Sequence, residues 1–260
     1  MPVPGGILPI MDVTSWISAL DDAGTRLAGA AERTGLDAEV PPCPGWRVRD
    51  VLRHTGGVHR WAATFVANGR TEPLPLANAE DIVAELPGDA ELVAWFRKGH
   101  AALVAALRAA PVDLECWTFL KAASPLAHWA RRQAHETTVH RVDVESAAGA
   151  LTPVDAGLAA DGVDELLACF GPRSRRLRLD PPRTLHVHAT DTGDHWTVRI
   201  STERAGVTRD ESGDDADTTV RGPAERLYLS LWNRAPLREL EVTGDETVVQ
   251  RWPEIHAIRW

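Results

Sequence analysis

The stretch RRQAHETTVHR (residues 131–141) is predicted to lie on one long helix that runs from about Pro125 to Ala148. A proline suits the first turn of a helix, where its missing N–H would have no partner anyway. Residues four apart are neighbours on one face of a helix, so Glu136 and His140 can bind the same ion. This pair is the first indication of chemistry in the sequence.

Three earlier segments place apolar residues at helical spacing, namely residues 13–33, about 47–67 and 89–109. The run Pro-Pro-Cys-Pro-Gly at residues 41–45 breaks the chain between the first two of them. Four amphipathic helices with polar connections are typical of a four-helix bundle.

The pattern changes after Pro153. Residues 155–170 and 223–234 are predicted to be helical, and the segments between and after them alternate as strands do. Those strand segments are 184–189, 196–200, 206–208, 218–221 and, as a last strand or edge, 240–243. We therefore expect an α+β fold. We expect residues 1–152 to form a metal-binding four-helix bundle and residues 153–260 to form a small α+β domain with an antiparallel sheet.

Bulk composition narrows the class of protein. Hydrophobic residues make up 44% and charged residues 25% of the 260 residues, as in an ordinary soluble protein. The formal net charge of −9 argues against generic binding to nucleic acid or an anionic membrane, and no apolar stretch approaches the roughly 20 residues that span a bilayer. The first residues do not resemble a signal peptide, and Cys43, Cys116 and Cys169 form no CxxC pair. These features favour a cytoplasmic protein.

A third ligand is available from the second predicted helix. His54 shares an apolar stripe with Val51, Val58 and Trp61, so its imidazole should point into the bundle, where it needs a polar partner. One carboxylate and two imidazoles suit Zn²⁺ with an open fourth position, and the ligand types also admit Ni²⁺, Fe²⁺ or Co²⁺. The structural alternatives are a solvated Glu–His ion pair and a histidine that is merely packed in the core.

The other histidines are sorted by their position along the helices. His100 falls on an inner face and is interpreted as a core residue. His128 is eight residues, about 12 Å, from the glutamate, too far to share the ion but able to line a cavity above it. His59 and His135 lie off the ligand faces, at the surface or behind the ligands. A zinc-peptidase HExxH motif is excluded because its fifth position is Val139.

Two motifs resemble a known family. The run CPGWRVRDVLRH (residues 43–54) resembles the start of the second bundle helix in mycothiol-dependent maleylpyruvate isomerase and its actinobacterial relatives. The run RRQAHETTVHRVD (residues 131–143) resembles the fourth-helix motif of that family. The resemblance covers nearly the whole chain. It implies a DinB-like metal-binding four-helix domain joined to a small C-terminal domain similar to sterol-carrier folds.

The same resemblance implies a set of site residues. His54, Glu136 and His140 would be the zinc ligands, and mycothiol, a low-molecular-weight thiol, would be the co-substrate. The family's functional C-terminal arginine, catalytic and cofactor-binding, best matches Arg234 at the end of a leucine-rich stretch, with Arg221 as a second candidate for cofactor binding. The structural alternative for either residue is a solvated surface arginine.

Several reactions fit such a site. A zinc-bound thiol becomes a thiolate at neutral pH and adds to a small electrophile, which gives an isomerase if the thiol leaves again and an S-transferase if it stays. Bound water would instead give a hydrolase or cyclase, and a cleft that only holds a small molecule would give a sequestering protein. Cys43 is expected to be packed or partly exposed rather than nucleophilic. We expect a monomer or homodimer.

Overall fold

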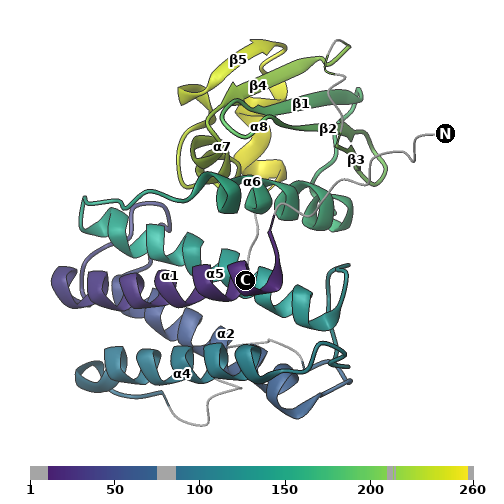
Figure 1. The fold of residues 1–260 in the computed structure, drawn as a ribbon. Coiled ribbons are helices and arrows are strands. Elements are labelled where there is room, and N and C mark those ends of the chain that lie inside the picture. The colour runs from purple at the N-terminus through teal and green to yellow at the C-terminus, as the bar shows by residue number, and fades with distance from the viewer. Residues whose placement is uncertain (1–10, 75–85, 210–212, 214, 257–260) are drawn as a thin grey trace.

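The computed structural model describes residues 11–74, 86–209, 213 and 215–256. Four long helices form an N-terminal bundle, as the apolar spacing predicts (Figure 1). They are α1 (Val13–Thr34), α2 (Val48–Asn68), α4 (Asp89–Ala109) and α5 (Pro125–Ala147). In the bundle α1 packs mainly along α5, and α2 packs mainly along α4.

Local signals explain where these helices begin. The Asp12 carboxylate accepts the backbone N–H of Ser15 at 2.7 Å, and the Ser124 hydroxyl accepts that of Ala127 at 3.1 Å. These side chains satisfy N–H groups that have no partner within the helix. Pro125 occupies the first turn of α5, as expected from the sequence.

The C-terminal half is an α+β unit. Its first helix, α6 (Ala156–Asp164), continues into a π-helical turn (Glu165–Phe170) and a short 3₁₀ turn (Gly171–Arg173). A five-stranded sheet follows in the order β3-β2-β1-β4-β5. Its strands are β1 (Arg183–Ala189), β2 (Asp194–Ile200), β3 (Gly206–Thr208), β4 (Thr218–Gly222) and β5 (Glu241–Gly244). The helices α7 (Ala224–Leu231) and α8 (Thr247–Ile255) and a 3₁₀ turn (Leu237–Glu239) complete the unit.

The sheet corrects the sequence-based expectation in one respect. Three of its four strand pairs are antiparallel, as expected, but β1 and β4 are parallel. The expectation was wrong there because β4 does not follow its neighbour through a hairpin: β2 and β3 lie between the two strands in the chain. Helix α8 was not expected from the sequence.

Helix α5 is the centre of the molecule rather than an ordinary amphipathic bundle helix. Nineteen of its 23 residues are buried, many of them polar or charged. Its Trp129 and Ala134 belong to the bundle core, whereas its Val139 and Val142 belong to the core of the C-terminal half. Because both halves pack on α5, each of its polar side chains needs a partner within the protein.

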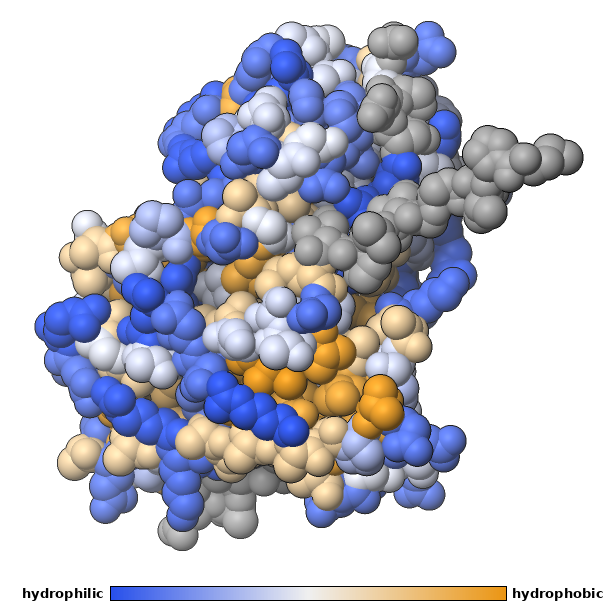
Figure 2. All heavy atoms as spheres, viewed as in Figure 1, coloured by the Kyte–Doolittle hydropathy of each residue, from blue (hydrophilic) through white to orange (hydrophobic). Residues whose placement is uncertain are grey.

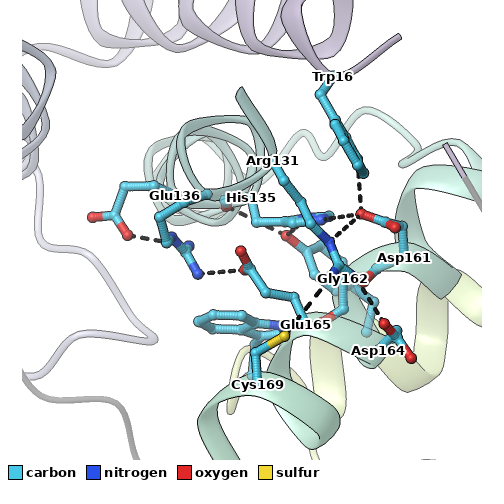
Figure 3. Close-up of polar contacts among 12 residues, drawn as sticks. Trp16, Arg131, His135, Glu136, Asp161, Gly162, Asp164, Glu165 and Cys169 are labelled. Atoms are coloured by element: carbon cyan, nitrogen blue, oxygen red, sulfur yellow. Dashed lines mark hydrogen bonds and ion pairs between the residues drawn. The ribbon is translucent and has the colours of Figure 1, made fainter. Parts of the chain in front are cut away.

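The two halves meet through a carboxylate on α6. Asp161 accepts hydrogen bonds from the Trp16 indole at 2.8 Å and from Arg131 Nε at 2.9 Å, and the His135 Nε2 atom lies 2.8 Å from the same oxygen (Figure 3). Arg131 also donates to Asp164 at 2.9 Å. Gly162 lets α6 lie close to α7 and to α5, since a Cβ there would lie 2.2 Å from the Tyr228 ring and 2.9 Å from His135 Nδ1.

Hydrophilic side chains cover much of the face shown in Figure 2, and apolar side chains gather over the bundle. Among the described helices none has both the length and the apolar character required to cross a bilayer.

We expect Asp161→Ala to lower the free energy of unfolding by about 3 kcal/mol, because it leaves Arg131 and His135 buried beside a missing carboxylate. Urea titration monitored by circular dichroism measures this loss. As a control, Asp22→Ala removes an exposed ion pair with Arg26 and should cost less than about 1 kcal/mol. Equal losses for the two variants would contradict a structural role for the Asp161 contacts.

Candidate metal centre

Helices α2 and α5 bring the three predicted ligands together. One ligand atom from each of His54, Glu136 and His140 lies within 4.8 Å of the other two. The Oε1 atom of Glu136 lies 3.1 Å from His54 Nε2 and 3.3 Å from His140 Nε2. The two imidazole centroids are 4.9 Å apart, so the three side chains converge on one small volume.

The burial of the three groups is unequal. The side chains of Glu136 and His140 are each only 3% exposed, whereas that of His54 is 13% exposed. His54 of α2 is therefore the least buried of the three candidate ligands.

Trp46 packs against both imidazoles. Its ring stacks on His140 at 6.3 Å and meets His54 edge-on at 5.4 Å. A tight turn positions the Trp46 side chain: the backbone N–H of Trp46 donates to the backbone carbonyl of Cys43 at 2.9 Å. Gly45 precedes Trp46 with a φ of 87°, which favours glycine. The break before α2 thus has a local role in holding the ligand rings.

The other nitrogen of His140 is held by a carboxylate. His140 Nδ1 lies 2.8 Å from Asp143 Oδ2, on the same helix. Arg234 donates to both oxygens of Asp143, from Nε at 2.9 Å and from Nη2 at 2.8 Å. A neutral His140 that keeps its Nδ1 proton on Asp143 would present the Nε2 lone pair to a metal, as a metal-ligating histidine requires.

Burial and hydrogen bonds shift the pKa values of two of the three groups, His140 and Glu136. Burial disfavours the charged forms, yet hydrogen bonds to Asp143 and Glu136 raise the pKa of His140 to about 9. Burial likewise opposes ionisation of Glu136, but hydrogen bonds with His140 and His54 hold its pKa well below the usual value. His54, His140 and Arg132 therefore compensate the buried charge of Glu136, and a metal bound there would displace a proton from His140.

The donor set fits a divalent transition metal. Two imidazole nitrogens and one carboxylate oxygen are ligands that Zn²⁺ accepts, with room for a fourth ligand from solution. The carboxylate on Nδ1 of His140 matches the support that such ligands commonly receive. These residues therefore could hold the metal that the sequence predicts.

The two predicted arginines are placed differently. Arg234 reaches the cluster through Asp143 and also lines a cleft of about 850 Å³, whose lining includes none of the three ligands. Arg221 lies on β4, where it donates to His188 and pairs with Glu241. Neighbouring Val220 is buried against the helices, so alternation places Arg221 on the opposite face of the sheet, away from the three ligands. Its position does not support a role at this site.

The other histidines considered in the sequence analysis are all buried. His100 packs in the bundle, as expected, with Nε2 3.3 Å from the Asp21 carbonyl oxygen. His59 and His135 are fully buried, so the surface alternative was wrong for both: His59 contacts Thr137, and His135 joins the contact between the halves. His128 packs edge-on against Phe119.

Cys43 is partly buried, which agrees with the expectation. Its Sγ lies 3.5 Å from Asp143 and 3.6 Å from Arg234. Burial, reinforced by the charge of Asp143, raises the pKa of its thiol to about 12. This thiol stays protonated at neutral pH and is not an activated nucleophile.

Sequence reasoning missed Arg132 and Glu165. Arg132 donates to the second oxygen of Glu136 at 3.4 Å and pairs with Glu165 of the π-helical turn. The i,i+4 spacing of Arg132 and Glu136 was visible in the sequence. Glu165 carried no local signal, because it reaches the site only through the docking of the two halves.

The fold and the converging side chains define a two-part protein with a candidate metal centre in its helical bundle, next to the α+β unit. Residues 17–145 match the family model of the mycothiol maleylpyruvate isomerase N-terminal domain, and residues 157–251 match that of the C-terminal domain of the same family. The chain therefore belongs to the mycothiol maleylpyruvate isomerase family, as the two sequence motifs indicate.

Solved structures agree at the level of the fold. The crystal structure of the mycothiol-dependent maleylpyruvate isomerase aligns with a TM-score of 0.62 and 12% sequence identity, over 90% of this chain and 93% of that one. A histidine-to-alanine mutant of that enzyme gives the same values. No curated protein matches this chain. The expected combination of helical bundle and α+β unit is confirmed.

We predict that His54→Ala and His140→Ala each abolish metal binding while the fold survives, because two remaining ligands hold a divalent ion poorly. Elemental analysis of the purified variants, with circular dichroism for the fold, tests this. His188→Ala is the control, since it removes a histidine from the sheet and should leave the metal content unchanged. Full metal content in either ligand variant would refute the assignment.

A second prediction concerns acid stability. Burial, with a smaller contribution from Arg132, lowers the pKa of His128 to about 3. The unfolded chain binds a proton at this residue below about pH 6.5, whereas the folded protein does not until about pH 3, so stability falls as the pH drops between these values.

Replacing His128 by Phe should flatten that fall by up to about 1.4 kcal/mol per pH unit. Urea titrations of the wild type and the variant at several pH values between 4 and 8 measure the difference. Parallel stability curves would contradict the neutral, buried state of His128.

Proposed function

We propose that this protein is a metal- and thiol-dependent enzyme that isomerises a small electrophilic substrate, with mycothiol as the thiol and Zn²⁺ as the first choice of metal. The observation that carries the proposal is the convergence of His54, Glu136 and His140 within 4.8 Å in a member of this family. The similar crystal structure is that of a mycothiol-dependent maleylpyruvate isomerase, which supports the choice of thiol and substrate class.

The metal supplies, when bound, the positive charge that lets a thiol lose its proton at neutral pH. The protein's own residues prepare the position. Glu136 contributes a negative charge that survives burial, and Asp143 fixes the ring of His140. Trp46 restricts the movement of both imidazoles by packing against them.

Arg234 acts in this proposal through its neighbours. Its Nε and Nη2 atoms both bond Asp143, so its first effect is to hold the carboxylate that orients His140. Its side chain also lines the 850 Å³ cleft, a volume suitable for a small-molecule ligand. Direct contact of Arg234 with mycothiol or substrate, which the family resemblance implies, remains a prediction.

The reaction follows from the properties of a thiolate. Its sulfur adds to one carbon of a conjugated cis double bond, the resulting single bond rotates, and elimination of the same sulfur restores the double bond in the trans form. The thiol is regenerated, so no net redox change occurs. A cytoplasmic location and a monomeric or homodimeric state remain predictions.

The test is turnover of maleylpyruvate by the metal-loaded protein with and without mycothiol, followed by the absorbance of the conjugated product. We expect isomerisation only when both metal and thiol are present, and Glu136→Gln should abolish it because the ligand charge is lost. Undiminished turnover without thiol would instead favour a hydrolase or cyclase. Stoichiometric consumption of the thiol would favour an S-transferase, and binding without turnover would favour a sequestering protein.

A further inference from the structure

A buried arginine connects the candidate metal ligand Glu136 to the C-terminal half. Arg132 is only 1% exposed and stands between two carboxylates that are each 2% exposed, Glu136 and Glu165. Its Nη2 lies 3.4 Å from Glu136 Oε2, and its Nη1 makes a closer contact with Glu165. Figure 3 draws Glu136 and Glu165 at the two ends of this bridge.

The aromatic surroundings of Arg132 strengthen its interactions with the two carboxylates. The guanidinium carbon of Arg132 lies 5.3 Å from the centroid of the Phe170 ring and 5.2 Å from that of Trp232, both of the C-terminal half. Aromatic walls exclude water, so charges interact more strongly here than at the surface. A change in the charge of Glu165 should therefore alter the electrostatic interaction between Arg132 and Glu136.

The geometry separates the two oxygens of Glu136. Oε1 faces the two histidines, and Oε2 faces Arg132. Glu165 draws the guanidinium toward itself and balances its charge. Without that balance, Arg132 would be free to pair with Glu136 through two parallel hydrogen bonds and would place an uncompensated positive charge beside the cation.

We propose that Glu165, acting through Arg132, is a positioning residue of the metal centre: it keeps Glu136 oriented and its charge available to the metal. This inference rests on the ligands of the proposed function. Glu165 begins a π-helical turn directly after α6, and such turns inside helices often occur at functional sites. The C-terminal half thus supports the metal centre from two sides, through Glu165 and through Arg234.

The test is the metal affinity of Glu165→Gln, measured by titrating the metal-free protein with Zn²⁺ in competition with a chromophoric chelator. Loss of outer partners of metal ligands typically weakens affinity by about 10–100-fold, and we expect a weakening in this range. Arg132→Lys should also weaken binding, because a single ammonium cannot bridge two carboxylates as a guanidinium does.

Asp161→Asn is the matched control. It weakens a neighbouring buried contact, between α5 and α6, but Asp161 touches Arg131 and His135 rather than a candidate ligand. Stability should therefore fall while the Zn²⁺ affinity stays at the wild-type value. A merely structural bridge would make Glu165→Gln behave like this control.

A folded Glu165→Gln with wild-type affinity overturns the inference, and if that variant does not fold, Arg132→Lys decides in the same way. A wild-type protein that binds no Zn²⁺, Ni²⁺, Fe²⁺ or Co²⁺ overturns the proposed function and this inference with it. Weak binding confined to the variants supports both.

Discussion

The structure depends on the burial of a polar helix on all sides. A helix surrounded by protein is normally apolar, yet α5 carries arginines, histidines and carboxylates through its buried length. Each such group loses its hydration on folding and has to be compensated within the protein. The compensation comes from opposite directions, with bundle helices on one side and the α+β unit on the other.

This constraint links the candidate site to the assembly of the two halves. One face of α5 presents Glu136 and His140 to His54 of the bundle, and an adjacent face presents Arg131 and His135 to α6. The C-terminal half also supplies Glu165 and Arg234, which reach the candidate ligands Glu136 and His140 through Arg132 and Asp143. The candidate metal site and the docking of the halves therefore depend on the same set of buried charged residues.

Much of the fold was predictable because it rests on local patterns. The four bundle helices follow from apolar spacing, and the i,i+4 pair of Glu136 and His140 follows from helix geometry. His54 was predictable from its place on an apolar stripe. The family resemblance selected Arg234, but only the structure shows that Asp143 stands between it and His140.

What escaped prediction depends on contacts between distant segments. The parallel pairing of β1 and β4, the burial of His59 and His135, and the bridge from Arg132 to Glu165 arise only when the halves meet. The surroundings of Arg221 were equally hidden: the sequence did not show which face of the sheet it would occupy or that it would donate to His188.

The close seat of α6 also bears on how such proteins diversify. Asp161 accepts from three side chains of the bundle half, and Gly162 allows the helix to approach Tyr228. A recombination event that joined residues 1–150 to an unrelated domain would remove α6. Arg131 and His135 would then lose the carboxylate of Asp161. A recombination point after α6 keeps the Asp161 contacts, so evolution or a protein engineer could exchange the segments that follow α6 with less damage to the bundle.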